Sequence, residues 1–229
     1  MKFSARIITP PIKLILSMLC RIDAGQLDKV PEEGPLIIII NHVNFLEVPL
    51  VFSFLLPRPV IGIVKKETWK NPILAILARS WDAIAIVRNS SDSSAMEKAL
   101  SVLANKGIII LAPEGTRSGN GQLQKGHGGV VQLALKGNAP ILPIAHYGGE
   151  QFWRNFKRLK RTPFSMQVGE AFYLTLPDGS KAPASISKSM RNAMTEAVMN
   201  RLSLLLPPAQ RGAYPDPENA PQDLISLIN

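Results

Sequence analysis

The chain has 229 residues, of which 46% are hydrophobic and 19% charged, a composition typical of a folded globular protein and not of a disordered one. Its net charge of +9 requires an anionic partner, such as nucleic acid, a membrane surface or a phosphorylated substrate. A single cysteine, Cys20, excludes an internal disulfide, and the three histidines lack the spacing of a zinc site. We therefore expect neither a bound metal nor a cofactor.

The first predicted element, in the N-terminal segment 1–22, is a short amphipathic helix that starts at Pro11 and ends at Ile22. Its apolar positions recur with helical spacing: Ile12, Ile15, Leu16, Leu19 and Ile22. About twelve helical residues reach roughly 18 Å, well short of the ~30 Å hydrocarbon core of a bilayer. The helix therefore either lies on a membrane surface or packs its apolar stripe on the domain. A signal peptide is a poor match, because Pro10 and Pro11 interrupt the apolar stretch and no small-residue cleavage site follows.

Residues 23–206 are expected to form one domain in which strands alternate with helices. The predicted strands are 22–28, 36–40, 60–64, 83–87, 107–112 and 140–146. The predicted helices are 44–55, 67–79, 93–105, 128–136 and 186–205. Alternation of this kind predicts an α/β fold with a mainly parallel sheet and helices on both of its faces. The Pro-rich segment 207–229 is interpreted as a poorly packed tail.

Two of the predicted strands, 36–40 and 107–112, are continuously aliphatic, as expected of strands buried on both faces. In parallel sheets, ligands bind in the crevice beyond the carboxyl ends of the strands. That rule directs attention to the loops that follow these strands, 41–47 and 113–126.

The first loop places His42 five positions before Glu47. A buried carboxylate that accepts one ring N–H of an imidazole leaves the other nitrogen as a base, as in a serine-hydrolase triad without its serine. No Gly-x-Ser-x-Gly motif occurs, so the nucleophile would be a hydroxyl of the substrate. The alternative is a helix cap, because Asn44 and Glu47 also have the spacing of a capping box.

The second loop contains residues 113–118, Pro-Glu-Gly-Thr-Arg-Ser. Gly115 permits a close approach of the backbone to a ligand, Thr116 offers a hydroxyl, and Arg117 can bind a phosphate bidentately. The alternative is a polar turn held by an ion pair between Glu114 and Arg117.

Together, Asn41-His42, Glu47 and the block 113–118 resemble the lysophospholipid acyltransferase family. The resemblance covers roughly residues 30–147, and the Glu-Gly-Thr-Arg-Ser block is its most specific part. It implies that His42 is the general base and that Glu47 orients it. It also implies that the acceptor's phosphate is bound by Glu114, Gly115, Thr116 and Arg117.

Two further blocks resemble the family, and two positions depart from it. The block 83–88 ends in Arg88, which the resemblance makes a second candidate phosphate ligand, and 139–144 resembles a proline-bearing strand. The commoner family pattern has Asp where this chain has Glu47, and Gly where this chain has Asp82. The longer Glu47 side chain still reaches an imidazole if its backbone sits farther back, whereas Asp82 would bring negative charge towards the phosphate. His127 and His146 are interpreted as structural.

The resemblance implies transfer of a fatty acyl group from acyl-CoA or acyl carrier protein to a lysophospholipid, with 1-acylglycerol-3-phosphate as the expected acceptor. The segment 152–164 interleaves aromatic and basic residues, which favours peripheral contact with an anionic membrane, on its cytoplasmic face. A nucleic-acid-binding domain also explains the charge but not two buried strands that deliver polar loops to one edge. The phosphate-loop motifs of nucleotide-binding enzymes are absent. A non-catalytic lipid-binding relative stays open.

Overall fold

The computed structural model describes residues 3–86 and 93–228, and all structural statements refer to these residues. The α-helices are α1 (Phe3–Leu19), α2 (Glu47–Leu55), α3 (Pro72–Ser80), α4 (Ser93–Ala104), α5 (Gly129–Gly137), α6 (Phe152–Phe156) and α7 (Lys188–Ser203). Short 3-10 helices are η1 (Gly25–Lys29), η2 (Lys66–Lys70), η3 (Gly149–Gln151), η4 (Pro208–Gln210) and η5 (Pro217–Asn219).

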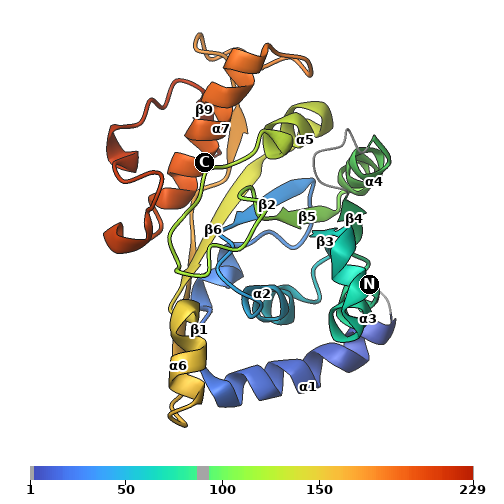
Figure 1. The fold of residues 1–229 in the computed structure, drawn as a ribbon. Coiled ribbons are helices and arrows are strands. Elements are labelled where there is room, and N and C mark those ends of the chain that lie inside the picture. Colours follow the sequence, from blue (N-terminus) through green and yellow to red (C-terminus); the bar gives the residue numbers. More distant parts are fainter. Residues whose placement is uncertain (1–2, 87–92, 229) are drawn as a thin grey trace.

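The strands of the described chain form one sheet with the order β1-β7-β6-β2-β5-β3-β4, extended by β8 on β6 and β9 on β8 (Figure 1). Their bounds are β1 (Cys20–Asp23), β2 (Leu36–Ile40), β3 (Val60–Lys65), β4 (Ile84–Ile86), β5 (Ile108–Leu111), β6 (Ile141–Tyr147), β7 (Thr162–Val168), β8 (Phe172–Leu174) and β9 (Ile225–Leu227). The pairs β2–β5, β2–β6, β3–β5, β3–β4 and β1–β7 are parallel, whereas β6–β7, β6–β8 and β8–β9 are antiparallel. The predicted α/β fold with a mainly parallel sheet is confirmed.

The central strand β2 is buried along its whole length because helices cover both faces of the sheet. Ile37 and Ile39 point into one hydrophobic cluster, to which α4, α5 and α7 contribute. Ile38 and Ile40 point into a second cluster, formed with α1 and α2. Figure 1 shows these two helix layers on opposite sides of the sheet. Burial on both faces explains why the strand sequence does not alternate between apolar and polar residues.

The N-terminal helix differs from its prediction at both ends: α1 begins at Phe3 rather than Pro11 and ends at Leu19 rather than Ile22. Its start is earlier because tertiary contacts hold the segment before the prolines, where the Trp81 Nε1–H donates to Thr9 Oγ1 (3.2 Å). Its end is earlier because Cys20–Asp23 pairs with β7 as strand β1. None of the helices in residues 3–86 and 93–228 is long and apolar enough to cross a membrane.

The surface of α1 is apolar on two sides. Leu16 is buried, and Ile12, Leu19 and Ile22 pack against the same cluster, so the predicted stripe faces the domain. The exception in that stripe is Ile15, which is exposed on α1 together with Ile7, Leu14 and Met18. Both interpretations of the segment therefore keep a physical basis, on different sides of the helix.

Other element bounds also shift. The predicted helix 67–79 is divided into η2 and α3, because Asn71 Oδ1 accepts from Leu74 N (3.1 Å) and starts a new helix at Pro72. In place of the predicted strand 22–28, the chain forms strand β1, which ends at Asp23, and then the 3-10 helix η1. The antiparallel strands β7, β8 and β9 were not predicted, because their sequence contains neither a continuous aliphatic run nor a clear turn pair.

The C-terminal segment is packed on the domain, so the expectation of a poorly packed tail is wrong. Tyr214 and Leu224 are buried, and β9 pairs with β8. Residues 208–214 form a strap across the loop that follows β5: Leu123 N donates to Gln210 O (2.9 Å), and Ala213 N donates to Leu123 O (2.9 Å). The prolines restrict regular structure here to the short helices η4 and η5 and strand β9, without preventing burial.

Gly212 is the point of closest approach between this strap and the loop. Its φ of +50° is in the left-handed region, and a Cβ at this position would lie 2.2 Å from the backbone oxygen of Leu123. We expect Gly212→Ala to destabilise the protein by about 2–4 kcal/mol, because it adds a clash with backbone to the conformational strain.

The matched control for Gly212→Ala is Gly179→Ala, which has φ +78° but open space around its Cβ. It should lower stability by only about 1 kcal/mol, from strain alone. Urea unfolding measures both free energies. Equal losses in the two variants would contradict the tight contact between the strap and the loop.

Candidate active site

The loops after β2 and β5 lie side by side because these strands are parallel neighbours, with Ile39 opposite Leu111. Two backbone hydrogen bonds join the loops: Ser118 N donates to His42 O (2.8 Å), and Gly119 N donates to Val43 O (3.0 Å). The polar residues predicted from two distant parts of the sequence are therefore brought to one edge of the sheet.

His42 and Glu47 form a hydrogen-bonded pair between the imidazole Nδ1 and the carboxylate Oε1. The Glu47 side chain is fully buried, whereas that of His42 is 16% exposed. Burial alone would raise the pKa of Glu47, but the hydrogen bond from His42, with smaller contributions from His146 and Asn44, holds that pKa below its ordinary value. An ionised carboxylate on Nδ1 leaves Nε2 as the nitrogen free to accept a proton.

The same Glu47 carboxylate also makes the hydrogen bond expected of a helix cap. Glu47 Oε2 accepts from Asn44 N (3.0 Å), while Asn44 Oδ1 accepts from Leu46 N (2.8 Å). Helix α2 therefore begins at Glu47, later than the predicted 44. A carboxylate has two oxygens, so orienting the histidine and closing the helix start are compatible. The longer side chain at this position reaches the imidazole.

Glu114, for which the family resemblance implies contact with the phosphate, has a carboxylate that is held by the backbone of the two loops. It is buried, and its two oxygens accept backbone N–H groups from His42 (2.5 Å) and Gln124 (2.8 Å). Burial raises the pKa of Glu114 to about 7; the two hydrogen bonds act in the opposite direction, and the charge of Glu47 adds to the rise. The geometry gives Glu114 the role of tying the two loops together. Its contact with a phosphate stays a prediction.

The residues of the block that follow Glu114 lie at or near the surface. Gly115 has φ +64° and Thr116 and Arg117 are exposed. Within the described residues Arg117 forms no ion pair with Glu114, because the Glu114 carboxylate is buried against backbone N–H groups. The turn is therefore not held by the alternative ion pair, and the guanidinium is available to an anion.

Two positions noted in the sequence lie elsewhere. Arg88 is outside the described residues. Asp82 has φ +54° in the turn before β4, at the opposite end of that strand from the edge that carries His42. A glycine adopts this conformation without strain, which explains the commoner residue there. The expectation that Asp82 brings negative charge towards the phosphate stays a prediction.

The structure adds contacts that the sequence did not reveal. Asn44 Nδ2 donates to Gly149 O (2.6 Å), and the Phe45 ring lies 5.5 Å from that of Trp153 at the start of α6. The aromatic segment 152–156 therefore packs directly on the loop that contains His42. His146, interpreted as structural, is buried and hydrogen-bonded to Asn41, whereas His127 is exposed.

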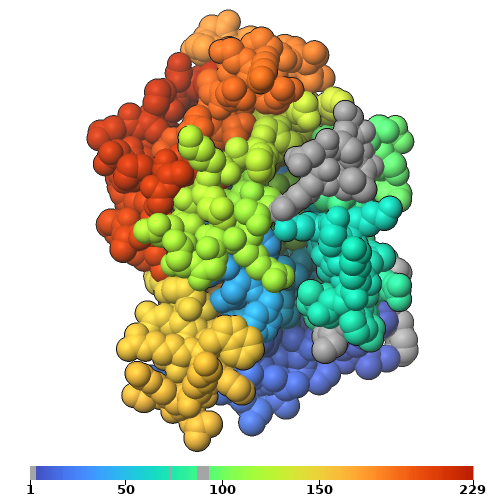
Figure 2. All heavy atoms as spheres, in the orientation of Figure 1, coloured from blue at the N-terminus to red at the C-terminus, as the bar shows by residue number. Residues whose placement is uncertain are grey.

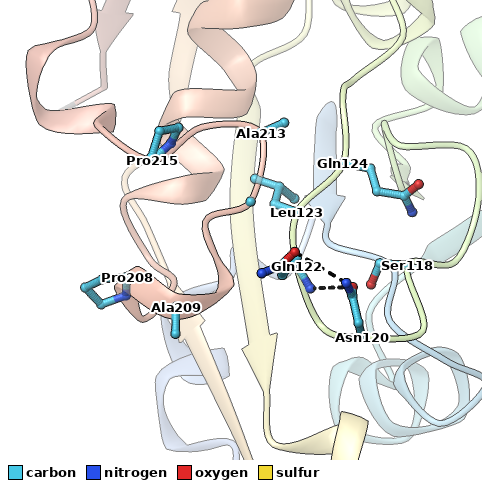
Figure 3. A pocket seen from close by; sticks show the side chains of 10 residues that line it. Ser118, Asn120, Gln122, Leu123, Gln124, Pro208, Ala209, Ala213 and Pro215 are labelled. Atoms are coloured by element: carbon cyan, nitrogen blue, oxygen red, sulfur yellow. Dashed lines mark hydrogen bonds between the residues drawn. The ribbon is translucent and has the colours of Figure 1, made fainter.

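An open pocket of about 510 Å³ lies beside these loops, between the loop after β5 and the C-terminal strap (Figure 3). Its lining is uncharged, with Ser118, Asn120, Gln122 and Gln124 on one side and Pro208, Ala213 and Pro215 among the residues on the other. His42 and Arg117 do not line it, so we do not assign the chemistry to this hollow. In the described part of the chain, no group of three His, Cys, Asp or Glu side chains is arranged to hold a metal ion.

Comparison with known proteins finds a family model described as Acyltransferase, which matches residues 21–147. The 1-acyl-sn-glycerol-3-phosphate acyltransferase of Bacillus subtilis is 25% identical over 194 residues, which are 85% of this chain and 92% of that protein. The enzyme of the same name from Pseudomonas aeruginosa is 28% identical over 207 residues, 86% of this chain and 75% of that protein.

A plant relative is more similar over a shorter region. The 1-acyl-sn-glycerol-3-phosphate acyltransferase of Limnanthes alba is 35% identical over 121 residues, 52% of this chain but only 43% of the relative. The crystal structure of the 1-acyl-sn-glycerophosphate acyltransferase from Thermotoga maritima superposes with a TM-score of 0.59 at 18% identity, covering 85% of this chain and 77% of that one. This likeness establishes the shared fold.

Proposed function

The chain belongs to the acyltransferase family, and we propose that it moves a fatty acyl group from a thioester to the free hydroxyl of a lysophospholipid in phospholipid synthesis. The observation that carries the proposal is the His42–Glu47 pair at the same sheet edge as Arg117. A base with an orienting carboxylate, and with no serine, threonine or cysteine side chain hydrogen-bonded to its ring among the described residues, suits direct transfer to a substrate hydroxyl.

In the proposed reaction, Nε2 of His42 accepts the proton of the acceptor hydroxyl as its oxygen attacks the thioester carbonyl carbon. The tetrahedral intermediate then collapses, the carbon–sulfur bond breaks, and the protonated imidazole returns its proton to the leaving thiolate. Glu47 holds the ring through Nδ1 and stabilises the imidazolium formed between the two steps. The thioester is acyl-CoA or acyl carrier protein, and the residues require no further cofactor for these proton transfers.

The acceptor proposed is 1-acylglycerol-3-phosphate. The names of the Bacillus, Pseudomonas and Limnanthes relatives support it, as does an exposed guanidinium that follows a left-handed glycine in the loop joined to His42. Arg117 provides charge and a planar pair of donors, which suit a phosphate monoester.

We place the enzyme at an anionic membrane surface, on the cytoplasmic face, as a peripheral protein. Two parts of the chain offer an amphipathic surface: the exposed apolar side of α1, and residues 153–160 in and after α6, called the tip below. At that tip three large apolar side chains are exposed close together in sequence, Trp153 (57%), Phe156 (46%) and Leu159 (97%), and clustered exposure of this kind is typical of an interaction surface. Exposed cations surround them: Arg154, Lys157, Arg158 and Lys160.

The two parts of this surface are physically connected. Arg161 donates to the carbonyls of Ser17 (2.6 Å) and Cys20 (2.7 Å) and so fixes the tip against the end of α1. Figure 2 shows the segment around α6 beside α1 on the lower surface of the molecule. Because Trp153 also packs on Phe45, lipid bound at this surface lies next to the loop of His42.

The first prediction about the reaction concerns the base. His42→Ala should lower kcat by about 10²–10⁴-fold, the usual contribution of a positioned general base, without unfolding the protein. The matched control is His127→Ala, an exposed histidine whose ring is not part of the pair. Turnover of labelled acyl-CoA with 1-acylglycerol-3-phosphate measures both. Near-wild-type kcat in His42→Ala, at an unchanged circular dichroism spectrum, would overturn the mechanism.

A second prediction concerns the phosphate. Arg117→Ala should raise KM for 1-acylglycerol-3-phosphate by about 10–100-fold, the value of a lost charge-assisted hydrogen bond. The same variant should leave the kinetics with 1-acylglycerol, which has no phosphate, unchanged. If both acceptors lose the same factor, or neither does, the phosphate binds elsewhere.

A third prediction concerns the membrane. Replacing Lys157, Arg158 and Lys160 together by alanine should weaken binding to phosphatidylglycerol-containing vesicles by about 100-fold, at ~1 kcal/mol for each charge. The control removes three exposed lysines at other sites: Lys136, Lys181 and Lys188. Vesicle sedimentation measures the binding. Equal weakening in the two triple variants would show that net charge, and not this surface, is responsible.

A further inference from the structure

The peptide bond between Asn41 and His42 is held at both of its polar ends. Its N–H, which belongs to His42, donates to Glu114 Oε1 (2.5 Å). Its carbonyl, which belongs to Asn41, lies 2.7 Å from Nε2 of His146. This peptide determines the direction in which the His42 side chain leaves the backbone, so the two partners together determine where the imidazole can lie.

His146 and Asn41 are bound to each other by more than this contact. The Asn41 side chain donates to the His146 carbonyl (2.9 Å) and accepts from the His146 N–H (2.8 Å). Both residues are buried, and the parallel register of β2 and β6 pairs Ile40 with Ile144, so Asn41 lies one residue and His146 two residues past that pair. The Asn41 side chain therefore replaces the backbone of β2 in binding β6, past the end of β2 and towards the site.

The chemistry of the contact defines the proton on His146. The Asn41 carbonyl can only accept, so Nε2 must be the nitrogen that carries hydrogen. Burial lowers the pKa of His146, which favours the neutral ring with that single proton. Nδ1 is then a buried acceptor, and within the described residues it has no hydrogen-bond partner.

Packing alone does not require a histidine here. The imidazole stacks on Phe164, with ring centroids 5.2 Å apart and planes 10° from parallel. A phenylalanine would stack equally well and would leave no unpaired acceptor in the core. The property that histidine adds is the Nε2–H donor to the peptide of His42.

We propose that His146 is a positioning residue for the reaction: its Nε2–H holds the Asn41 carbonyl, and with Glu114 it sets the orientation of the His42 imidazole towards the acceptor hydroxyl. The proposal rests on the proposed function of His42 as the base. It does not require His146 to touch substrate or to exchange a proton.

The test uses two variants that separate the donor from the ring. His146→Phe keeps the stacking on Phe164 and removes the donor, whereas His146→Gln keeps an N–H donor of similar reach and removes the ring. We expect His146→Phe to lower kcat by about 10–100-fold with little change in KM, because a base displaced by ~1 Å loses a factor of that order. His146→Gln should recover most of kcat. Thermal unfolding is measured on both, so that kcat is compared between folded proteins.

A second readout does not depend on turnover. With ¹⁵N-labelled histidine, the Nδ1 proton of His42 in its hydrogen bond to Glu47 should give a far-downfield resonance in the wild type and in His146→Gln. That resonance should shift or broaden in His146→Phe. A residue that serves only packing would give the opposite order, with His146→Phe resembling the wild type in both kcat and spectrum.

The outcomes are distinguishable from a failure of the proposed function. If the wild-type protein turns over no lysophospholipid but the His42 resonance changes in His146→Phe alone, the positioning contact stands and the proposed reaction falls. If the wild type is active and His146→Phe matches it in kcat and in the His42 resonance, the positioning proposal is overturned while the acyltransferase function remains.

Discussion

The parallel pairing of β2 with β5 on one side and β6 on the other is the constraint on which the site depends. A strand buried on both faces must satisfy every backbone polar group through its neighbours, so its register is rigid. The residues immediately past its end inherit that rigidity, because β5 and β6 end at the same edge. Past the ends of β2 and β5, the side chains of Asn41 and Glu114 continue the pairing, Asn41 with His146 of β6 and Glu114 with the His42 N–H.

That continuation explains how carboxylates can be buried at this edge. Glu114 and Glu47 each accept backbone N–H groups or an imidazole, so each charge is compensated where water is excluded. What remains exposed after these pairs are made is the far side of the His42 ring and the Arg117 guanidinium. The proposed base and the proposed anion-binding group are thus left facing solvent on a rigid support, while the acidic residues form part of that support.

The fold and the two loops could be predicted from sequence because their signals are local. Aliphatic runs at 36–40 and 107–112 indicate buried parallel strands, and the polar residues beyond them follow from the edge rule. The strap at 208–214 and the antiparallel strands could not be predicted, since their order comes from partners distant in the chain. His146 was accessible in principle: it ends the predicted strand 140–146, and the edge rule applied to His42 applies equally to it.

The exposed aromatic residues of α6 connect the proposed membrane surface to the loop that contains His42. Phe45 lies between His42 and Glu47 in sequence and packs on Trp153, which is itself half exposed beside Leu159. We expect an apolar chain that enters at this tip to meet Phe45 before the imidazole, with its polar headgroup towards the loop of Arg117. A lysophospholipid has this arrangement of parts, an apolar chain, a hydroxyl and a phosphate in succession. This expected order of groups along the site matches the order of groups along the proposed acceptor.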